Sequence, residues 1–396
     1  MNRPASPATR TLLAAAVVGT IGWLGIIGIG LQLAGASSRA LGFDLELLLE
    51  AGRDVAAGDS PYARDLIGGA PPTATDLFYS YPPPVAQLLA LVAGAPSSVM
   101  LVVWAVGAVG GLLFAADALR RRLAPHRSRA TVLAVVAAAA PLTLPFAVGL
   151  LFGNFDVYFP FLYGLMLVAA IDPTARTAMT GGIGLAVASL KLHPASMGVW
   201  FLVRWLRDRA SGSGSVIAWA IAFGVAMLAL SVVLGGTGLW LDYVDVVRSG
   251  TGASIVDPRN AGIAALVASA GGGDDAFART LHVAVALLAI AVTIWAGWRR
   301  GDLVEAFAWA TAASLSTLPV TWYHYPSAMM PIGIAAWLRS GAGDRRRVTM
   351  TLVAAEIAAA AALVVLPLLW LAIGLVILAA RWSRAAASPA PVRGGG

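Results

Sequence analysis

Apolar runs long enough to cross a lipid bilayer recur along the whole chain, and this feature limits the fold more than any other. A helix needs about 20 consecutive apolar residues to span the hydrocarbon core. The first run, 11–35, follows Arg3 and Arg10 and is too long for the apolar part of a signal peptide, so we interpret it as a retained membrane anchor. With 59% hydrophobic and 12% charged residues, the chain falls outside the composition of soluble domains. We predict an all-α polytopic integral membrane protein.

The span-length rule predicts about 10–12 transmembrane helices. The apolar segments lie near 11–34, 97–119, 130–150, 154–171, 178–190, 193–206, 216–235, 277–298, 303–320, 325–339, 349–365 and 367–380. The segments 178–190 and 193–206 are short, which favours broken or re-entrant helices there. We expect a single membrane domain, 1–383, followed by a disordered cytoplasmic tail, 384–396.

The charged residues are distributed unequally between the loops, and this predicts the orientation. Of 27 basic residues, 20 fall on one side of the layout, in clusters such as Arg120–Arg122 and Arg345–Arg347. Cytoplasmic loops carry an excess of Lys and Arg, so that side is predicted to be cytoplasmic. Of 20 acidic residues, 13 lie on the other side. Since the basic clusters alternate with apolar runs, the net charge of +7 indicates membrane topology and no nucleic-acid partner.

The chain contains no cysteine, which excludes disulfides, thiolate metal ligands and cysteine nucleophiles. We expect neither a metal nor a cofactor. Two long loops, 36–84 and 236–276, are predicted to lie outside the membrane on the acidic side. Loops of this length are usually functional or disordered.

The first outer loop contains a predicted amphipathic helix that starts near Leu45. Its apolar residues recur at the i, i+3, i+4, i+7 spacing of one helix face, and such a helix is suited to the outer membrane surface. The other face holds Glu46, Glu50, Arg53 and Asp54. Asp44 stands at the N-terminus of this helix, where aspartate is a favoured cap. The residues alone therefore leave both a capping and a functional role open for Asp44.

Aromatic and polar residues mark the outer ends of other predicted spans. Tyr81 and three prolines directly precede an apolar helix within 78–94, which fits a rigid helix start as well as an interfacial anchor. Asn154 and Asp156 open the span 154–171. An acid at a membrane boundary can be solvated, whereas an acid inside a span marks a functional site.

The segment 189–198 combines charge with a helix break. Lys191, His193 and Pro194 separate two apolar half-runs, and Lys191 is the only lysine in the chain. A lysine at the bilayer centre costs about 2.5–3.5 kcal/mol. We therefore expect Lys191 to snorkel, to pair with an anion or to face a polar cavity.

The segment 321–331 joins two spans on the predicted outer side. It carries His324, one of four histidines, next to Trp322, Tyr323 and Tyr325. An aromatic belt at the membrane interface would explain the aromatic residues without a function for the histidine. A role of His324 in a site is the alternative.

Taken together, these segments resemble glycosyltransferase family 87, the polyprenyl-phosphate-dependent mannosyltransferases of actinobacteria, which include PimE-like enzymes and have arabinofuranosyltransferases nearby. The residues that carry the resemblance are the Asp-Leu start and AG…G…PY pattern at 43–62, YPPP at 81–84, Gly-Asn at 153–154, K-L-x-P at 191–194 and W-x-H-Y at 322–325. The chain departs from the pattern at Phe155-Asp156, where a neutral residue is expected. The role of Asp156 is therefore open.

The resemblance implies a GT-C-type membrane fold and an inverting sugar transfer. The donor would be a polyprenyl-phosphate sugar, and the acceptor a cell-envelope glycolipid or lipoglycan outside the inner (plasma) membrane. By that similarity, Asp44 takes the place of the catalytic carboxylate of the first outer loop, and His324 that of a histidine in the late outer loop. The expected substrate-binding residues are Tyr81, Asn154, Asp156, Lys191, His193, Arg259, Trp322 and Tyr325.

The residues fit this chemistry independently of the resemblance. Polyprenyl phosphate is a good leaving group, so the transfer needs one base for the acceptor hydroxyl, worth about 10²–10⁴-fold, and cations near the phosphate. Lys191 and Arg259 are candidates for the cations. Mannose is the expected donor sugar, and arabinofuranose is the alternative. A lipid or sugar transporter or flippase is the alternative from another class, because transporters also use broken helices.

Overall fold

The computed structural model describes residues 7–36, 40–62, 78–250 and 255–383. The regular secondary structure in these ranges is entirely helical, with no strand, which confirms the predicted all-α class. The tail predicted at 384–396 lies outside the described residues, as does 63–77 of the first outer loop.

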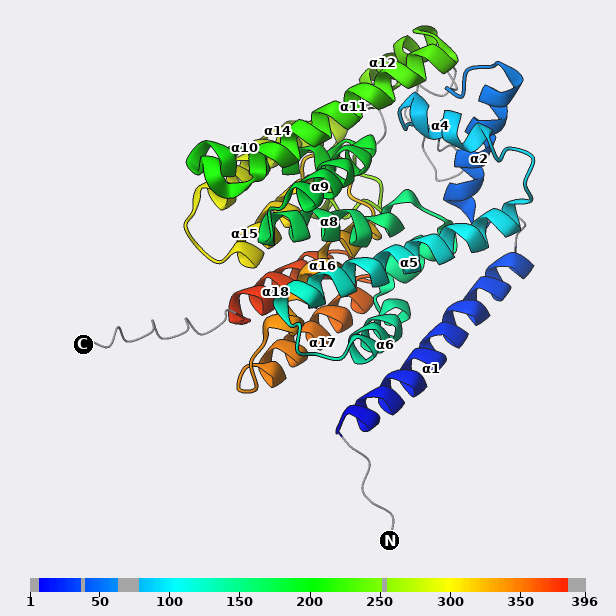
Figure 1. Ribbon diagram of the computed structural model, residues 1–396. Helices are drawn as coiled ribbons and strands as arrows, with labels where there is room; N and C mark the ends of the chain where they lie inside the picture. The colour runs from blue at the N-terminus through cyan, green and yellow to red at the C-terminus, as the bar shows by residue number, and fades with distance from the viewer. Residues whose placement is uncertain (1–6, 37–39, 63–77, 251–254, 384–396) are drawn as a thin grey trace.

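Figure 1 shows the helices as an irregular bundle, with α1 along one side. The α-helices, in chain order, are α1 (Pro7–Ala36), α2 (Phe43–Ala57), α4 (Pro83–Ala90), α5 (Ser97–Leu123), α6 (Arg129–Ala139), α7 (Leu144–Phe152), α8 (Phe159–Ile171), α9 (Ala175–Ala188), α10 (Ser196–Arg207), α11 (Ser213–Gly235), α12 (Gly238–Gly250), α13 (Ile263–Gly271), α14 (Asp275–Trp298), α15 (Leu303–Ser314), α16 (Met330–Arg339), α17 (Arg345–Ala361) and α18 (Leu368–Trp382). Short 3₁₀ helices join some of them: η2 (Ala140–Leu142), η3 (Phe155–Tyr158), η4 (Ser189–Lys191), η5 (His193–Ala195), η6 (Arg209–Ser211) and η7 (Tyr325–Met329).

Each predicted apolar segment falls on a helix, but many of these helices are short. Among the described residues, four are long and apolar enough to cross a bilayer alone, namely α1, α5, α11 and α14. The chain through α6, η2 and α7 bends by 71° and counts as a fifth span if it is taken as one broken helix. These helices make the chain a multi-pass membrane protein, whereas the number of 10–12 crossings stays a prediction.

The centre of the bundle is α8, which is apolar on all sides and buried over most of its length. A helix of this kind belongs in the interior of a bundle, since it has no polar face to expose. Glycines let its neighbours approach closely, as is typical of packed membrane helices. A Cβ added to Gly164 would lie 2.6 Å from the Cβ of Ala115 on α5, and one added to Gly181 would lie 2.5 Å from that of Ala169.

The apolar face of α2 is covered by protein. Leu45, Leu48 and Leu49 are buried in a cluster with residues of α4 and α12. Gly52 allows this close contact, because an added Cβ would lie 2.8 Å from the carbonyl carbon of Leu89 on α4. The predicted amphipathic helix is confirmed. The expectation that its apolar face rests on the membrane surface is wrong, because α4 and α12 already occupy that face.

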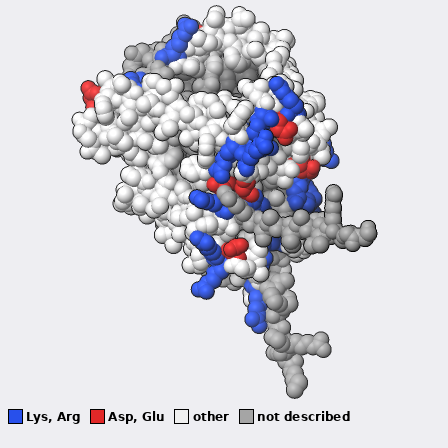
Figure 2. All heavy atoms as spheres, turned by 90° about the vertical axis from the view of Figure 1, so that its left-hand side faces the viewer, with Lys and Arg blue, Asp and Glu red and all other residues white. Residues whose placement is uncertain are grey.

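The connections between helices sort to two ends of the bundle. In Figure 1 the C-terminal end of α5, the α10–α11 turn and the α14–α15 turn lie toward the left, whereas α2, α4 and α12 lie at the opposite end. Figure 2 looks at this left-hand side and shows Lys and Arg side chains gathered on an otherwise largely uncharged surface. This basic end is the side for which the sequence predicts a cytoplasmic location.

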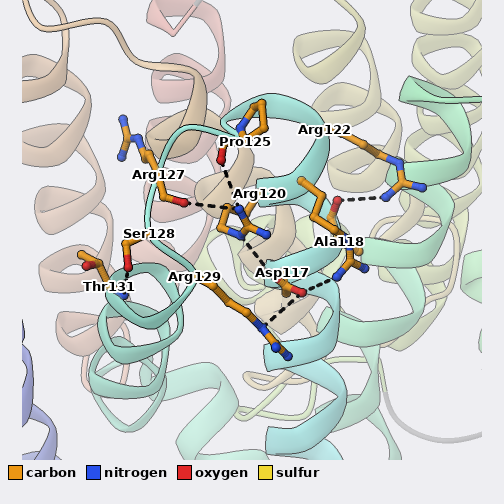
Figure 3. Close-up of polar contacts among 10 residues, drawn as sticks. Asp117, Ala118, Arg120, Arg122, Pro125, Arg127, Ser128, Arg129 and Thr131 are labelled. Atoms are coloured by element: carbon orange, nitrogen blue, oxygen red, sulfur yellow. Dashed lines mark hydrogen bonds and ion pairs between the residues drawn. The ribbon is translucent and has the colours of Figure 1, made fainter.

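Ion pairs and ring contacts organise the basic end. Asp117 on α5 is buried and lies 2.9 Å from Arg120 and 3.5 Å from Arg129 (Figure 3). Guanidinium groups also lie over tryptophan rings, in the pairs Arg127–Trp337, Arg204–Trp200, Arg209–Trp205, Arg299–Trp295 and Arg347–Trp382. Tryptophan is enriched where a helix leaves the membrane, so these pairs support a membrane boundary at this end.

The orientation is testable with single cysteines, because the chain has none of its own. Ser60 is exposed after α2 and donates to Asp242 of α12 at 2.7 Å, so it joins both predicted outer loops. We expect a membrane-impermeant maleimide to label Ser60→Cys in intact cells. The exposed Ala210 at the basic end serves as the control, since Ala210→Cys should react only after permeabilisation. The reverse labelling pattern would show that the orientation is inverted.

The bend between η2 and α7 is joined to α17 by a buried carboxyl group. Glu356 Oε1 accepts a hydrogen bond from Thr143 Oγ1 at 3.1 Å, and Glu356 Oε2 is buried without a hydrogen-bond partner among the described residues. If the Thr143 hydroxyl is removed, the buried Glu356 carboxyl loses its hydrogen-bond donor. This lowers the free energy of unfolding by about 1–3 kcal/mol. We expect Thr143→Val to lower the melting temperature of the purified protein, and Thr143→Ser to keep it. Equal melting temperatures would mean that the hydrogen bond contributes nothing to stability.

Candidate active site

Segments far apart in the sequence bring several polar side chains together beside the start of α2. They come from the first turn of α2, the α7–η3 turn, η3 itself, the break between α9 and α10, and the residue before η7. We call the following five residues the polar network: Asp44, Asn154, Asp156, Lys191 and His324.

The α7–η3 turn is shaped by a glycine and an asparagine. Gly153 has φ 68°, a conformation that favours glycine and ends α7. A Cβ at Gly153 would also lie 2.5 Å from the Cβ of Leu45 on α2, so a larger residue would separate the two segments. Asn154 then caps η3, because its Oδ1 accepts the N–H of Asp156 at 2.9 Å. The Gly-Asn pair thus places Asn154 and Asp156 next to α2.

The break between α9 and α10 contains a strained residue. Leu192 has φ 63°, and it is the only non-glycine residue with positive φ in the described ranges. Such a conformation costs about 1–3 kcal/mol and persists where the surrounding structure enforces it. It separates η4 from η5, and its two chain neighbours are Lys191 and His193. The predicted break is confirmed, and its strained point lies between two predicted site residues.

Asn154 connects a lysine with a carboxylate. Lys191 Nζ donates to Asn154 Oδ1 at 3.2 Å, and Asn154 Nδ2 donates to Asp44 Oδ2 at 2.8 Å. The N-cap position of α2 is Gly42, so Asp44 is not the cap that its position in the sequence suggested. Its carboxylate instead faces the polar network.

Asp156 is fully buried, with 0% of its surface exposed. Its Oδ2 lies 2.8 Å from Lys191 Nζ and 3.1 Å from His324 Nε2, which is close enough for an ion pair but poorly aligned for a hydrogen bond. The alternative of a solvated acid at a membrane boundary is therefore wrong for Asp156. Of the three expectations for Lys191, pairing with an anion is the one observed, since a buried charge requires a close partner.

Aromatic rings surround the lysine and the histidines. Lys191 Nζ lies 4.7 Å from the ring centroid of Tyr325 and 5.5 Å from that of Tyr81. His193 is 1% exposed and stacks on Tyr325 at a centroid distance of 4.8 Å. Neither ring nitrogen of His193 has a hydrogen-bond partner among the described residues. Tyr81 and Tyr325 thus face the site, which an interfacial belt alone does not explain.

Arg259 and Trp322 form a separate pair near the network. The Arg259 guanidinium lies 5.7 Å from the Trp322 ring, and its Nε donates to Asp257 Oδ1 at 2.9 Å. This hydrogen bond holds the pKa of the Asp257 carboxyl below its ordinary value. Since Asp257 already balances the charge of Arg259, the structure does not bring Arg259 into the polar network. Trp322 packs against the hydrophobic core that includes Tyr325 and precedes His324 by two residues.

Two residues that support the site were missed by the sequence analysis. Asn260 is buried, and its Oδ1 accepts the N–H of Thr321 at 2.9 Å while its Nδ2 donates to the carbonyl of Pro319 at 3.0 Å. It thereby holds the chain just before Trp322. Ser327 donates to the Asp156 carbonyl at 2.9 Å, which joins η7 to η3. Only the general preference of Asn and Ser for turns could have indicated them.

The network combines two carboxylates, an ammonium group and an imidazole, which are groups suited to proton transfer and to binding a phosphate. Among the described residues, no group of three His, Cys, Asp or Glu side chains is arranged to hold a metal ion. Fold and site thus define a multi-pass membrane protein with a largely buried cluster of polar and charged side chains.

Comparison with known families identifies the class more closely. The sequence model of glycosyltransferase family 87 matches residues 79–321, more than half of the chain. The chain belongs to glycosyltransferase family 87 and is a membrane glycosyltransferase. No curated protein and no solved structure gives a significant match. The family membership favours the enzyme over a transporter or flippase.

The matched range does not include the whole polar network. Asn154, Asp156 and Lys191 lie inside it, whereas Asp44 and His324 lie outside its two ends. The contacts of Asp44 with Asn154, and of His324 with Asp156, connect these two residues to the matched part of the chain.

Proposed function

We propose that this glycosyltransferase moves mannose from a polyprenyl-phosphate donor to a hydroxyl group of a cell-envelope glycolipid or lipoglycan. The observation that carries the proposal is the chain of hydrogen bonds from Lys191 through Asn154 to Asp44. The Asn154 amide lies between the two charged groups. Lys191, on one side, is a cation suited to the donor phosphate, and Asp44, on the other side, is a carboxylate suited to the acceptor hydroxyl.

The transfer follows from these roles. The acceptor oxygen attacks the anomeric carbon of the donor sugar, and the bond from that carbon to the phosphate oxygen breaks. The lipid phosphate leaves with the electron pair, and the Asp44 carboxylate takes the proton of the acceptor hydroxyl. Attack on the face opposite the leaving group inverts the anomeric configuration. Lys191 stabilises the charge that develops on the departing phosphate.

The remaining residues of the site complete this assignment. His324 lies beside Asp156 and Tyr325, where its imidazole is available to the phosphate or the sugar hydroxyls. Tyr81 and Tyr325 form aromatic walls for the sugar, and sugar rings pack well on such surfaces because of their apolar C–H faces. With the basic end in the cytoplasm, the site lies toward the extracytoplasmic side of the plasma membrane.

A sugar-transfer assay tests the proposal. The purified protein in lipid nanodiscs is incubated with radiolabelled polyprenyl-phosphate mannose and an extract of envelope glycolipids. We expect labelled glycolipid to form, with the inverted anomeric configuration. A parallel reaction with polyprenyl-phosphate arabinofuranose separates the two donors within the family. Transfer from arabinofuranose alone would replace mannose in the proposal, and no transfer from either donor would contradict a polyprenyl-phosphate donor.

A further inference from the structure

Asp156 interacts with two residues of the site through a single oxygen. Lys191 Nζ and His324 Nε2 both approach Asp156 Oδ2, at 2.8 and 3.1 Å. The lysine comes from η4 and the histidine from the residue before η7. The shared oxygen therefore brings Lys191 and His324 together without a direct interaction between them.

The backbone of Asp156 is fixed from both sides. Its N–H donates to Asn154 Oδ1 at 2.9 Å, and its carbonyl accepts from Ser327 at 2.9 Å. The side chain has no exposed surface, so neither the sugar-donor lipid nor the acceptor substrate touches it directly. These contacts suit a residue that acts through its neighbours, as buried carboxylates that orient a histidine do in other enzymes.

We propose that Asp156 is a positioning residue, which holds the Lys191 ammonium and the His324 imidazole on one carboxylate oxygen so that both face the donor. This inference rests on the proposed function. Lys191 is held by a hydrogen bond, and His324 by a 3.1 Å contact that is too poorly aligned for a hydrogen bond.

Asp156→Asn affects the two contacts unequally. The amide oxygen can still accept the hydrogen bond of the Lys191 ammonium group, but it has no charge to attract the His324 imidazole, which forms no hydrogen bond to Asp156. The substitution should therefore retain Lys191 and loosen His324, while the backbone contacts to Asn154 and Ser327 remain. We expect kcat to fall about 10²-fold, the lower end of what a positioned acid–base group contributes, with a donor KM within about threefold of the wild type.

A matched control distinguishes positioning from the general cost of losing a buried carboxylate. Asp117 on α5 is buried and paired with arginines (Figure 3). These ion pairs include no residue of the polar network. Asp117→Asn should leave kcat per folded molecule unchanged. A fall of kcat in Asp117→Asn equal to that in Asp156→Asn would overturn the assignment, because it would reveal a general structural effect.

A double-mutant cycle with His324→Ala provides the decisive measurement. If Asp156 acts through His324, the double variant Asp156→Asn/His324→Ala should have the same kcat as His324→Ala, within about threefold. Losses that multiply would contradict the proposal. If Asp156→Asn does not accumulate in the membrane, the effect of His324→Ala is measured in the double variant Asp156→Asn/Lys191→Gln. That variant lacks both charges of the buried pair, so neither is left without its partner. There His324→Ala should have little further effect, and a loss as large as in the wild-type background would refute the proposal.

The wild-type reaction separates this inference from the proposed function. A wild-type protein that transfers the sugar, combined with multiplying losses, contradicts the role of Asp156 alone. A wild-type protein that transfers no sugar from any polyprenyl-phosphate donor contradicts the proposed function and the role of Asp156 with it.

Discussion

Asp44→Asn is expected to lower kcat by roughly 10²–10⁴-fold, the contribution of a general base, while the donor lipid still binds. Asparagine has the size of aspartate but cannot take a proton from the acceptor hydroxyl. Its side-chain oxygen can still accept the hydrogen bond that Asn154 Nδ2 now donates to Asp44 Oδ2. The substitution therefore removes the base and keeps the geometry around it.

Asp54 provides the matched control for Asp44. It lies on the same helix, α2, and is exposed to solvent on the polar face. Asp54→Asn makes the same chemical change without touching the polar network, so its kcat should equal that of the wild type. The measurements are turnover with labelled donor and donor binding by the purified proteins. Activity of Asp44→Asn within a few-fold of the wild type would remove Asp44 from the catalytic step.

Removal of the Lys191 charge should weaken donor binding by roughly 10–100-fold. A hydrogen bond to a charged group is worth about 1.5–3 kcal/mol, and each 1.4 kcal/mol corresponds to a factor of about 10 in affinity. Lys191→Met alone is not a clean test, although methionine suits an apolar site. It leaves the fully buried Asp156 without its cation, and breaking a buried pair in this way costs about 3–5 kcal/mol of stability.

The charge-compensated comparison avoids that problem. Donor affinity is measured for Lys191→Met/Asp156→Asn and for Asp156→Asn, at temperatures where both variants are folded. The two proteins differ only in the lysine, and the double variant contains no unpaired buried charge. We expect the double variant to bind the donor roughly 10–100-fold more weakly. Equal affinities would exclude Lys191 as the residue that binds the donor phosphate.

Local patterns in the sequence were sufficient to predict the individual helices near the site. Proline at the first helical positions marked the start of α4, as observed at Pro83. The charged and proline-containing segment around Lys191 marked the break between α9 and α10, and the 3.6-residue period marked α2. These features depend on residues within one or two turns of each other, so a single sequence contains the information they need.

The partners across the site could not be obtained in the same way. The sequence left Lys191 to snorkel, to pair with an anion or to face a polar cavity, and it did not indicate that Asp156, 35 positions away, is its partner. Nor could it separate capping from function for Asp44, whose contact Asn154 lies 110 positions along the chain. The resemblance to the family proposed Asp44 and His324 as site residues without the contacts that connect them.

The sequence by itself thus determined a helical membrane protein, the position of its helices and breaks, and the unequal distribution of charge between its two ends. Only the tertiary structure decided that α4 and α12 cover the apolar face of α2, and that Asp156 is a buried partner of Lys191 and His324. The reason is physical. Hydrophobic periodicity and helix breaks are set by neighbours along the chain, whereas the pairing of buried polar groups depends on how separate helices pack against one another.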